Sequence, residues 1–441
     1  MSCILSFFLR KKFWIKDFFK GSPMWKAFKE VTLIAQNTKE GELLRKKRLN
    51  EFLSFVTSNT VYYKGKKYNS LLDFPVIDKK IILDNYSSFT TPAKLIPGQI
   101  GPIHVQKTSG STGTPFEIPQ DTRCRTRRIA TIKVANELIG FHSFEPMMHL
   151  RAIKHYWNMA GEMIWNKDLQ ILYVDNANLT EKRVEEIIKA INEYKIKVVR
   201  GYMTTIDTIT RYALEHNINL DTKPTFISVG ELLLESLRLR IIMMGCKVIS
   251  QYGNEENGIL GQSEFNGSGS NIILNRANCY IEILKMDRDE PVGEDELGRI
   301  VVTDFSNYAM PMIRYEIGDL AMIDKVSESG EILSIKNLSG RKTDLIYRTD
   351  GTCVDIFNSI PAEIYNNPCV RQWQFIQKDR SYYQLNLCVS NESVKADEEN
   401  FIKLLEQILG DDAIVDVFYK DEIPVLSSGK RKVVINEWKK L

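Results

Sequence analysis

The strongest constraint on the fold is an alternation of strand-like and helix-like segments between residues 171 and 250. Short apolar runs alternate with stretches whose apolar residues recur at helical spacing, the first of them opening at Thr180 as a capping residue. The strand-like segments are 171–174, 197–200, 225–229 and 247–250, and the helical ones are 180–191, 206–213 and 235–244. Strands that alternate with helices form βαβ units, so the pattern predicts an α/β fold with a mostly parallel sheet.

The pattern changes after Tyr252. Short strands bounded by Gly, Asn and Asp predict an antiparallel, β-rich subdomain, and a small α+β unit begins near Gly340. The short strands are 271–274, 280–284, 299–303 and 320–323; the last unit has strands at 345–347, 372–377, 383–389 and 413–419 and a helix at 398–409. We expect a large domain with a helical region (1–100) and a core (101–340), followed by a small C-terminal domain (341–441).

Composition excludes several classes of protein. A chain of 441 residues is long enough for two or three domains with large cores. The formal net charge is only +3, which gives no reason to expect nucleic-acid binding. Seven dispersed cysteines without a CxxC pair argue against a disulfide framework or a zinc site and fit a reducing cytoplasm.

The first twenty residues mix aromatic and basic side chains. No apolar run reaches the roughly 18 residues of a spanning helix, and the apolar run 3–9 precedes its basic residues, the reverse of a signal peptide. The favoured interpretation is a helix that packs its aromatics on the body, because the basic cluster is short and the apolar positions circle the helix. The alternative is a cytoplasmic protein that makes peripheral contact with the anionic inner surface of the membrane.

A glycine- and hydroxyl-rich stretch, Lys107 to Pro115, carries the most specific chemical signal. Gly110 and Gly113 let the backbone turn tightly and bring its amides to an anion, while the neighbouring hydroxyls add donors. The sequence TSGSTGTP lacks the GK[ST] ending of a Walker loop. A polar hairpin is the structural alternative.

This stretch resembles the phosphate-binding signature of the adenylate-forming enzymes, which include acyl-CoA synthetases and adenylation domains. Further stretches resemble the signatures of that superfamily in the same order: Gln251–Glu256, Met312–Asp319, Gly340–Asp344 and Ser427–Lys430. Phe74–Lys79, Asn85 and Pro311–Tyr315 resemble the phenylacetate–CoA ligase branch and its relatives in capsular-polysaccharide clusters, and Asp350–Gly351 favours the capsule-type relatives.

The resemblance implies a nucleotide site. Tyr252 would lie along the adenine, the Asp319 carboxylate would accept the ribose hydroxyls, and Glu256 would hold Mg²⁺. The full set of implied nucleotide-binding residues is Thr108, Ser109, Gly110, Ser111, Thr112, Gly113, Gly230, Glu231, Tyr252, Gly253 and Asp319. Each acid has a structural alternative: a helix cap for Glu231, a loop acid for Glu256 and a turn residue for Asp319.

The resemblance also implies two catalytic cations. Lys430, on a mobile small domain, would neutralise charge on the α-phosphate, and Arg341 would donate to ribose or phosphate oxygens. A basic tail and a surface ion pair are their structural alternatives. His155 lies where relatives build the acid pocket, although a lone histidine among aromatics is more often a core residue. Two departures from the pattern are acids, Glu255 for the usual threonine and Glu316 for the usual arginine.

We therefore expect an ATP- and Mg²⁺-dependent ligase that converts a small carboxylic acid into an acyl adenylate. A thiol such as coenzyme A, an amine or a carrier protein would then accept the acyl group while the small domain turns about Thr343–Asp344. An acyl-protein synthetase and a non-catalytic nucleotide-binding assembly factor are the alternatives. The resemblance also admits a homodimer, and it leaves the acid unidentified.

Overall fold

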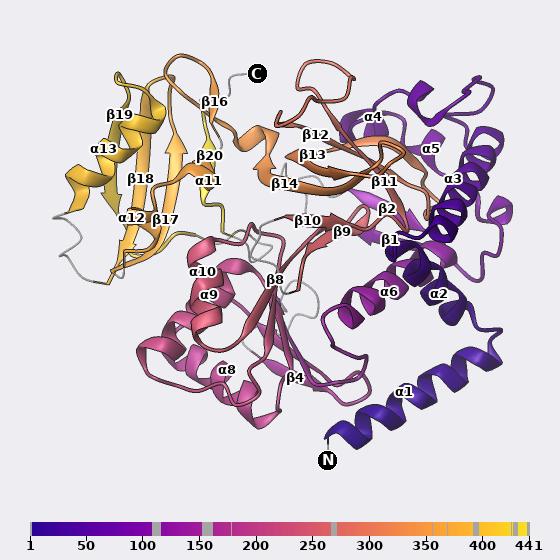
Figure 1. The fold of residues 1–441 in the computed structure, drawn as a ribbon, viewed down its shortest axis with the longest axis horizontal. Coiled ribbons are helices and arrows are strands. Elements are labelled where there is room, and N and C mark those ends of the chain that lie inside the picture. Colours follow the sequence, from indigo (N-terminus) through magenta and orange to yellow (C-terminus); the bar gives the residue numbers. More distant parts are fainter. Residues whose placement is uncertain are drawn as a thin grey trace.

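The structure is a computed structural model of the whole chain, and it describes residues 2–107, 116–151, 162–177, 179–265, 271–354, 356–367, 369–390, 397–424, 426 and 431–438. It is a mixed α/β protein with a large body and a separate small C-terminal domain (Figure 1). The predicted fold class is confirmed.

One mixed sheet of twelve strands runs through the described part of the body, in the order β11-β12-β13-β14-β10-β9-β8-β7-β6-β3-β5-β4. Its strands are β3 (Met147–Arg151), β4 (Met163–Asn166), β5 (Ile171–Asp175), β6 (Val198–Gly201), β7 (Thr225–Val229), β8 (Lys247–Asn254), β9 (Gly258–Ser263), β10 (Ile272–Leu274), β11 (Cys279–Leu284), β12 (Gly298–Asp304), β13 (Met312–Val326) and β14 (Ile332–Arg341). Strands β5, β3, β6, β7 and β8 pair in parallel, and every pair from β8 to β11 is antiparallel. The expected β-rich subdomain is thus continuous with the parallel sheet, because β8 extends past its predicted end and pairs with both halves.

Three helices cover one face of the parallel half: α8 (Glu181–Glu193), α9 (Met203–Glu215) and α10 (Glu235–Met243) (Figure 1). Thr180 caps α8 as predicted, its hydroxyl accepting from the Arg183 amide at 3.3 Å. The apolar stripe of α8, which includes Val184, Ile187 and Ile191, packs into the core beneath the sheet. Burial of this stripe explains why the helical periodicity was readable from the sequence.

The first part of the body is helical. It contains α1 (Ser2–Phe19), α2 (Pro23–Ala35), α3 (Lys39–Asn59), η1 (Leu71–Asp73), α4 (Lys79–Asp84), α5 (Tyr86–Phe89), η2 (Ala93–Leu95), the hairpin of β1 (His104–Lys107) and β2 (Glu117–Gln120), and α6 (Thr122–Glu137). Asp78 caps α4, its carboxylate accepting from the Ile81 amide at 2.7 Å.

Arg314 fastens this region to the sheet. Its guanidinium donates to Glu282 at 3.1 and 3.0 Å and to the carbonyls of Leu72 and Phe74 at 3.1 and 2.9 Å. Beside it, Ile77 forms a parallel bridge with Tyr315. Arg314 therefore acts as a buried cross-link between the helical region and β13, and its role is structural.

The C-terminal domain has its own core. Its elements are η3 (Lys342–Asp344), β15 (Ile346–Tyr347), β16 (Cys353–Val354), α11 (Ile356–Ser359), α12 (Ala362–Tyr365), β17 (Val370–Gln377), β18 (Tyr382–Val389), α13 (Glu398–Leu409), β19 (Ile414–Tyr419) and β20 (Val434–Asn436). The main sheet has the order β19-β18-β17-β20, with α13 packed on it (Figure 1). Helix α13 has the predicted bounds, since two acids open it and its apolar residues keep one face.

Candidate nucleotide site

The parallel strands bring several predicted residues to one edge of the sheet. Register pairs Val229 of β7 with Gln251 of β8, so Gly230 and Tyr252 follow side by side at the carboxyl ends of the strands. This is the edge at which open α/β sheets bind ligands. Gly230 has a φ of +71°, which glycine adopts without strain, and a Cβ at Gly253 would lie 2.3 Å from the Gly258 carbonyl oxygen.

Glu231 joins the body to the small domain. Its carboxylate accepts hydrogen bonds from the Thr204 amide at 2.9 Å and the Thr204 hydroxyl at 3.3 Å, which caps the first turn of α9. It also accepts from the Arg431 backbone amide at 3.1 Å. Glu231 thus caps α9, which precedes it in sequence. The structural alternative to nucleotide binding was that Glu231 caps the helix that follows it.

Tyr252, Asp319 and Arg341 come together from three strands. The Tyr252 hydroxyl donates to Asp319 Oδ2 at 2.9 Å, and Arg341 Nε lies 3.5 Å from Asp319 Oδ1. Asp319 and Arg341 face each other in the β13–β14 ladder. Burial, followed by the Asp319 charge, raises the pKa of Tyr252 well above its ordinary value, so the phenol stays protonated and donates. The group thus offers an aromatic face, a carboxylate acceptor and a half-exposed guanidinium.

Glu256 lies in the turn between β8 and β9. Arg128 donates to the carbonyls of Glu255, at 3.0 Å, and Glu256, and Gln106 of β1 donates to Glu255 Oε2 at 2.9 Å. These contacts fix the turn against the strand that leads into residues 108–115. Burial raises the pKa of Glu256, and the positive charge of Arg341 opposes this shift.

Mg²⁺ requires hard oxygen ligands, and one carboxylate together with substrate phosphates is its usual protein donor set. Among the described residues, no group of three His, Cys, Asp or Glu side chains could hold a metal by itself. The partly buried Glu256 carboxylate fits the role of a single protein ligand, because ionisation of this side chain is costly without a nearby cation.

Three predicted parts of the site lie outside the described residues. They are Thr108, Ser109, Gly110, Ser111, Thr112 and Gly113 of the glycine-rich stretch, then His155, and then Lys430. The described flanks are β1, which ends at Lys107, and Arg431, whose amide contacts Glu231. The position next to Lys430 is thus fastened to the sheet edge that carries Gly230 and Tyr252.

Sequence reasoning missed a polar row on the same sheet. His149 of β3 pairs in register with Tyr173 of β5 and Arg200 of β6. Burial, and then the charge of Arg200, lowers the pKa of His149 to about 3; burial lowers that of Arg200 to about 10. The signal was present as His149 and Arg151 alternating with apolar residues in MMHLR, a half-buried strand pattern.

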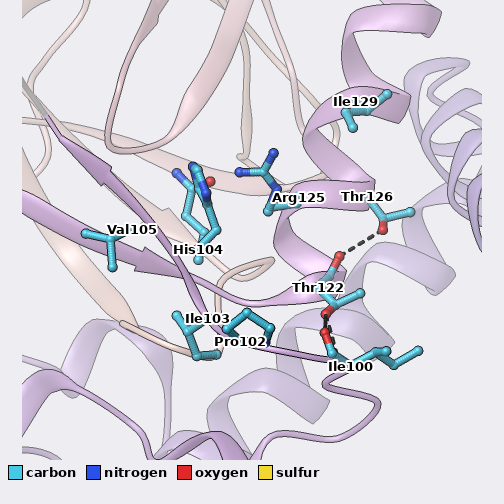
Figure 2. A pocket seen from close by; sticks show the side chains of 10 residues that line it. Ile100, Pro102, Ile103, His104, Val105, Thr122, Arg125, Thr126 and Ile129 are labelled. Atoms are coloured by element: carbon cyan, nitrogen blue, oxygen red, sulfur yellow. Dashed lines mark hydrogen bonds between the residues drawn. The ribbon is translucent and has the colours of Figure 1, made fainter.

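A hollow of about 540 Å³ opens beside the β1–β2 hairpin (Figure 2). His104 and Val105 of β1 line it together with Thr122, Arg125 and Thr126 of α6. Among the described residues, no predicted site residue lines this hollow.

Comparisons with known proteins agree with this arrangement. Residues 346–437 match the family described as CapK C-terminal domain. Protein CapK of Staphylococcus aureus is 24% identical over 420 residues, covering 90% of this chain and 89% of CapK.

Solved structures show the same fold. A 2-hydroxyisobutyryl-CoA ligase in the postadenylation state, in complex with 2-HIB-AMP, is 17% identical with a TM-score of 0.66, covering 91% of this chain and 90% of the ligase. The same ligase in the thioesterification state is 16% identical with a TM-score of 0.51, covering 91% of this chain and 91% of the ligase. The amide bond synthetase McbA of Marinactinospora thermotolerans is 14% identical with a TM-score of 0.53, covering 74% and 67%.

The likeness to this ligase in both states shows a shared fold. The ordered motifs, the sheet topology and the comparisons agree on the fold of the chain. It has the fold of the acyl-adenylate-forming CoA ligases, and its residues 346–437 match the CapK C-terminal domain.

Proposed function

We propose that the protein is an ATP-dependent ligase that activates a small carboxylic acid as its adenylate. The observation that carries this proposal is the meeting of Tyr252, Asp319 and Arg341 at the sheet edge where Glu231 contacts the small domain. The Asp319 carboxylate accepts hydrogen bonds from the ribose hydroxyls, Tyr252 lies along the adenine, and Gly230 leaves room for the base. Bound Mg²⁺, held by Glu256, would reduce the negative charge of the phosphates.

In the reaction, an oxygen of the substrate carboxylate attacks the α-phosphorus of ATP. The bond from that phosphorus to the bridging oxygen of the β-phosphate breaks, and pyrophosphate leaves with the electron pair. Arg341 is half exposed beside Asp319 and donates to the nucleotide. Lys430, whose role comes from the resemblance, would neutralise charge on the α-phosphate. The described residue next to it, Arg431, contacts Glu231.

In the second half-reaction a thiol, coenzyme A in the first instance, attacks the carbonyl carbon of the acyl adenylate and loses its proton. The bond from that carbon to the phosphate oxygen breaks and AMP leaves with the electron pair; an amine or a carrier protein is the alternative acceptor. Among the described residues, hydrogen bonds that join the body to the small domain include Arg211 to the Val370 carbonyl at 3.3 Å. Such a contact allows the small domain to turn between the two half-reactions. The similarity to CapK, together with the motifs that resemble capsule-type relatives, supports a role in polysaccharide biosynthesis. A cytoplasmic location stays a prediction from the sequence.

The acid would lie toward the row formed by His149, Tyr173 and Arg200. A desolvated guanidinium favours an anionic or strongly polar substituent on the acid. A panel of mono- and dicarboxylic, hydroxy and sugar acids, scored for pyrophosphate release and then for thioester formation, tests the proposal. Release that requires an acid and disappears in Asp319→Ala supports it. Nucleotide binding without release from any acid favours the assembly factor, and acyl labelling of a partner cysteine favours the acyl-protein synthetase.

A further inference from the structure

The helix α1 presents an apolar face away from the body. Six large apolar side chains on it are each between 50% and 81% exposed: Ile4, Phe7, Phe8, Ile15, Phe18 and Phe19. At 100° per residue they fall within an arc of about 120° on one side of the helix. Apolar positions do circle the helix as a whole, as expected, since Leu9, Phe13 and Trp14 lie outside this arc, but the most exposed ones share one side.

The opposite side of α1 holds the helix in place. Ser6 and Asp17 are buried there, and the Asp17 carboxylate accepts from the amides of Met24 and Trp25 at 3.0 and 2.9 Å, which caps α2. Beside them, rings of Phe13, Trp14, Trp25, Phe28 and Phe144 pack together. The interpretation favoured from the sequence thus holds for Phe13 and Trp14, while the outer aromatics have no place in the core.

Basic side chains accompany the apolar face. Lys11, Lys12, Lys16 and Lys20 are exposed, and the acid within α1, Asp17, is buried in its capping contact. The helix runs along the rim of the molecule beside α2, with its outer side clear of the other elements (Figure 1). The described helices include none with the length and apolar character needed to cross a bilayer.

We propose that α1 is a surface anchor that docks the protein on an anionic lipid bilayer. Phenylalanine and isoleucine side chains would enter the boundary between headgroups and acyl chains, and the lysines would contact lipid phosphates. A protein partner with an apolar groove would also bury the aromatics. The exposed cations without an exposed acid on the same helix favour a uniformly anionic surface. This inference does not depend on the proposed ligase activity.

The experiment is cosedimentation of the full chain with vesicles of phosphatidylglycerol and phosphatidylcholine, compared with phosphatidylcholine alone. We expect binding to the anionic vesicles only, weakened by salt, and lowered about tenfold or more in Phe8→Ser/Phe18→Ser. A Lys12→Glu/Lys16→Glu variant should bind less. The matched controls Ile100→Ser/Met243→Ser and Lys189→Glu remove equally exposed side chains elsewhere and should bind like the wild type.

Because the substituted residues are exposed, thermal unfolding and nucleotide binding should stay unchanged in every variant. The proposal is overturned if anionic vesicles do not sediment the protein, or if the controls lose binding as much as the α1 variants. It is also overturned if light scattering shows self-association that Phe8→Ser/Phe18→Ser abolishes without any vesicle binding, since α1 would then cover a second copy of the chain.

Discussion

Glu231→Gln should separate the two half-reactions. In the structure the carboxylate accepts from the Thr204 amide at 2.9 Å, the Thr204 hydroxyl at 3.3 Å and the Arg431 amide at 3.1 Å. Glutamine has the same shape but a single acceptor oxygen. If that oxygen remains on the Thr204 amide, the new NH₂ group faces the Arg431 N–H, and two donors then oppose each other.

The loss can be bounded from this geometry. A hydrogen bond to a charged acceptor contributes about 1.5–3 kcal/mol, and the lower value suits the partly exposed Arg431 contact. A loss of about 1.5 kcal/mol lowers the population of the docked small domain about tenfold. We therefore expect acid-dependent ATP–pyrophosphate exchange to fall up to about tenfold. Thioester formation from a supplied acyl adenylate should change little, because it uses another domain arrangement.

The control is Thr204→Val, which removes the hydroxyl and keeps the amide that Glu231 caps. This variant should retain exchange within about twofold, as expected for a weak exposed contact. Equal losses in both half-reactions of Glu231→Gln would refute the reasoning, and so would an equal loss in Thr204→Val. Either result would mean that Glu231 acts by supporting α9 and has no part in docking the small domain.

Three further predictions test the site and its support. Asp319→Asn should weaken ATP binding about tenfold or more by calorimetry, because an amide replaces the charged acceptor that Tyr252 and the ribose share. Glu256→Gln should abolish exchange yet raise the unfolding temperature at pH 7. Burial raises the pKa of Glu256, so the ionised form destabilises the folded state above that pKa. The rise in unfolding temperature should therefore vanish toward pH 4.5. Glu255→Gln is the control. Asp121→Ala should lower the free energy of unfolding in urea by about 3 kcal/mol or more, since this buried carboxylate accepts from the amides of Cys124, Tyr308 and Ala309; a loss below about 1 kcal/mol would contradict that role.

Elements with local signals could be predicted from the sequence. Helix α13 begins with two acids and keeps one apolar face, and its predicted bounds agree with the structure. Strand β13 was predicted as 320–323 but runs from Met312 to Val326. Its first half holds Arg314 and Gly318 at positive φ and several charged residues, so it does not alternate as a strand should. Those charges are paired with residues that are distant in sequence, such as Glu282, and no local pattern reveals these partners.

The site was predictable as a list of residues and not as an arrangement. The motifs named Tyr252, Asp319 and Arg341, but their contacts join strands far apart in the chain. The contact between Glu231 and Arg431 spans two hundred residues and depends on where the small domain docks. The placement of residues 108–113, His155 and Lys430 stays a prediction, because the described residues do not include them.

The two acidic departures from the family pattern, Glu255 and Glu316, support the non-catalytic alternative together with the basic aromatic N-terminus. In the structure Glu316 is paired with opposite charges, whereas Glu255 accepts from a neutral amide. Gln106 donates to Glu255, whose charge also acts on the buried Arg200 guanidinium. Glu316 forms an ion pair with Arg299 and lies 3.9 Å from Lys342.

A charge that is paired where it is partly buried adds little net field at a neighbouring site. The Glu316 carboxylate therefore places no uncompensated negative charge beside Asp319, which keeps its contacts with Tyr252 and Arg341. The charge of Glu255 does act on the neighbouring Glu256, whose pKa it helps to raise. The substitutions are accounted for by the packing of β12, β13 and the β8–β9 turn, so they give no reason to expect that nucleotide binding has been lost.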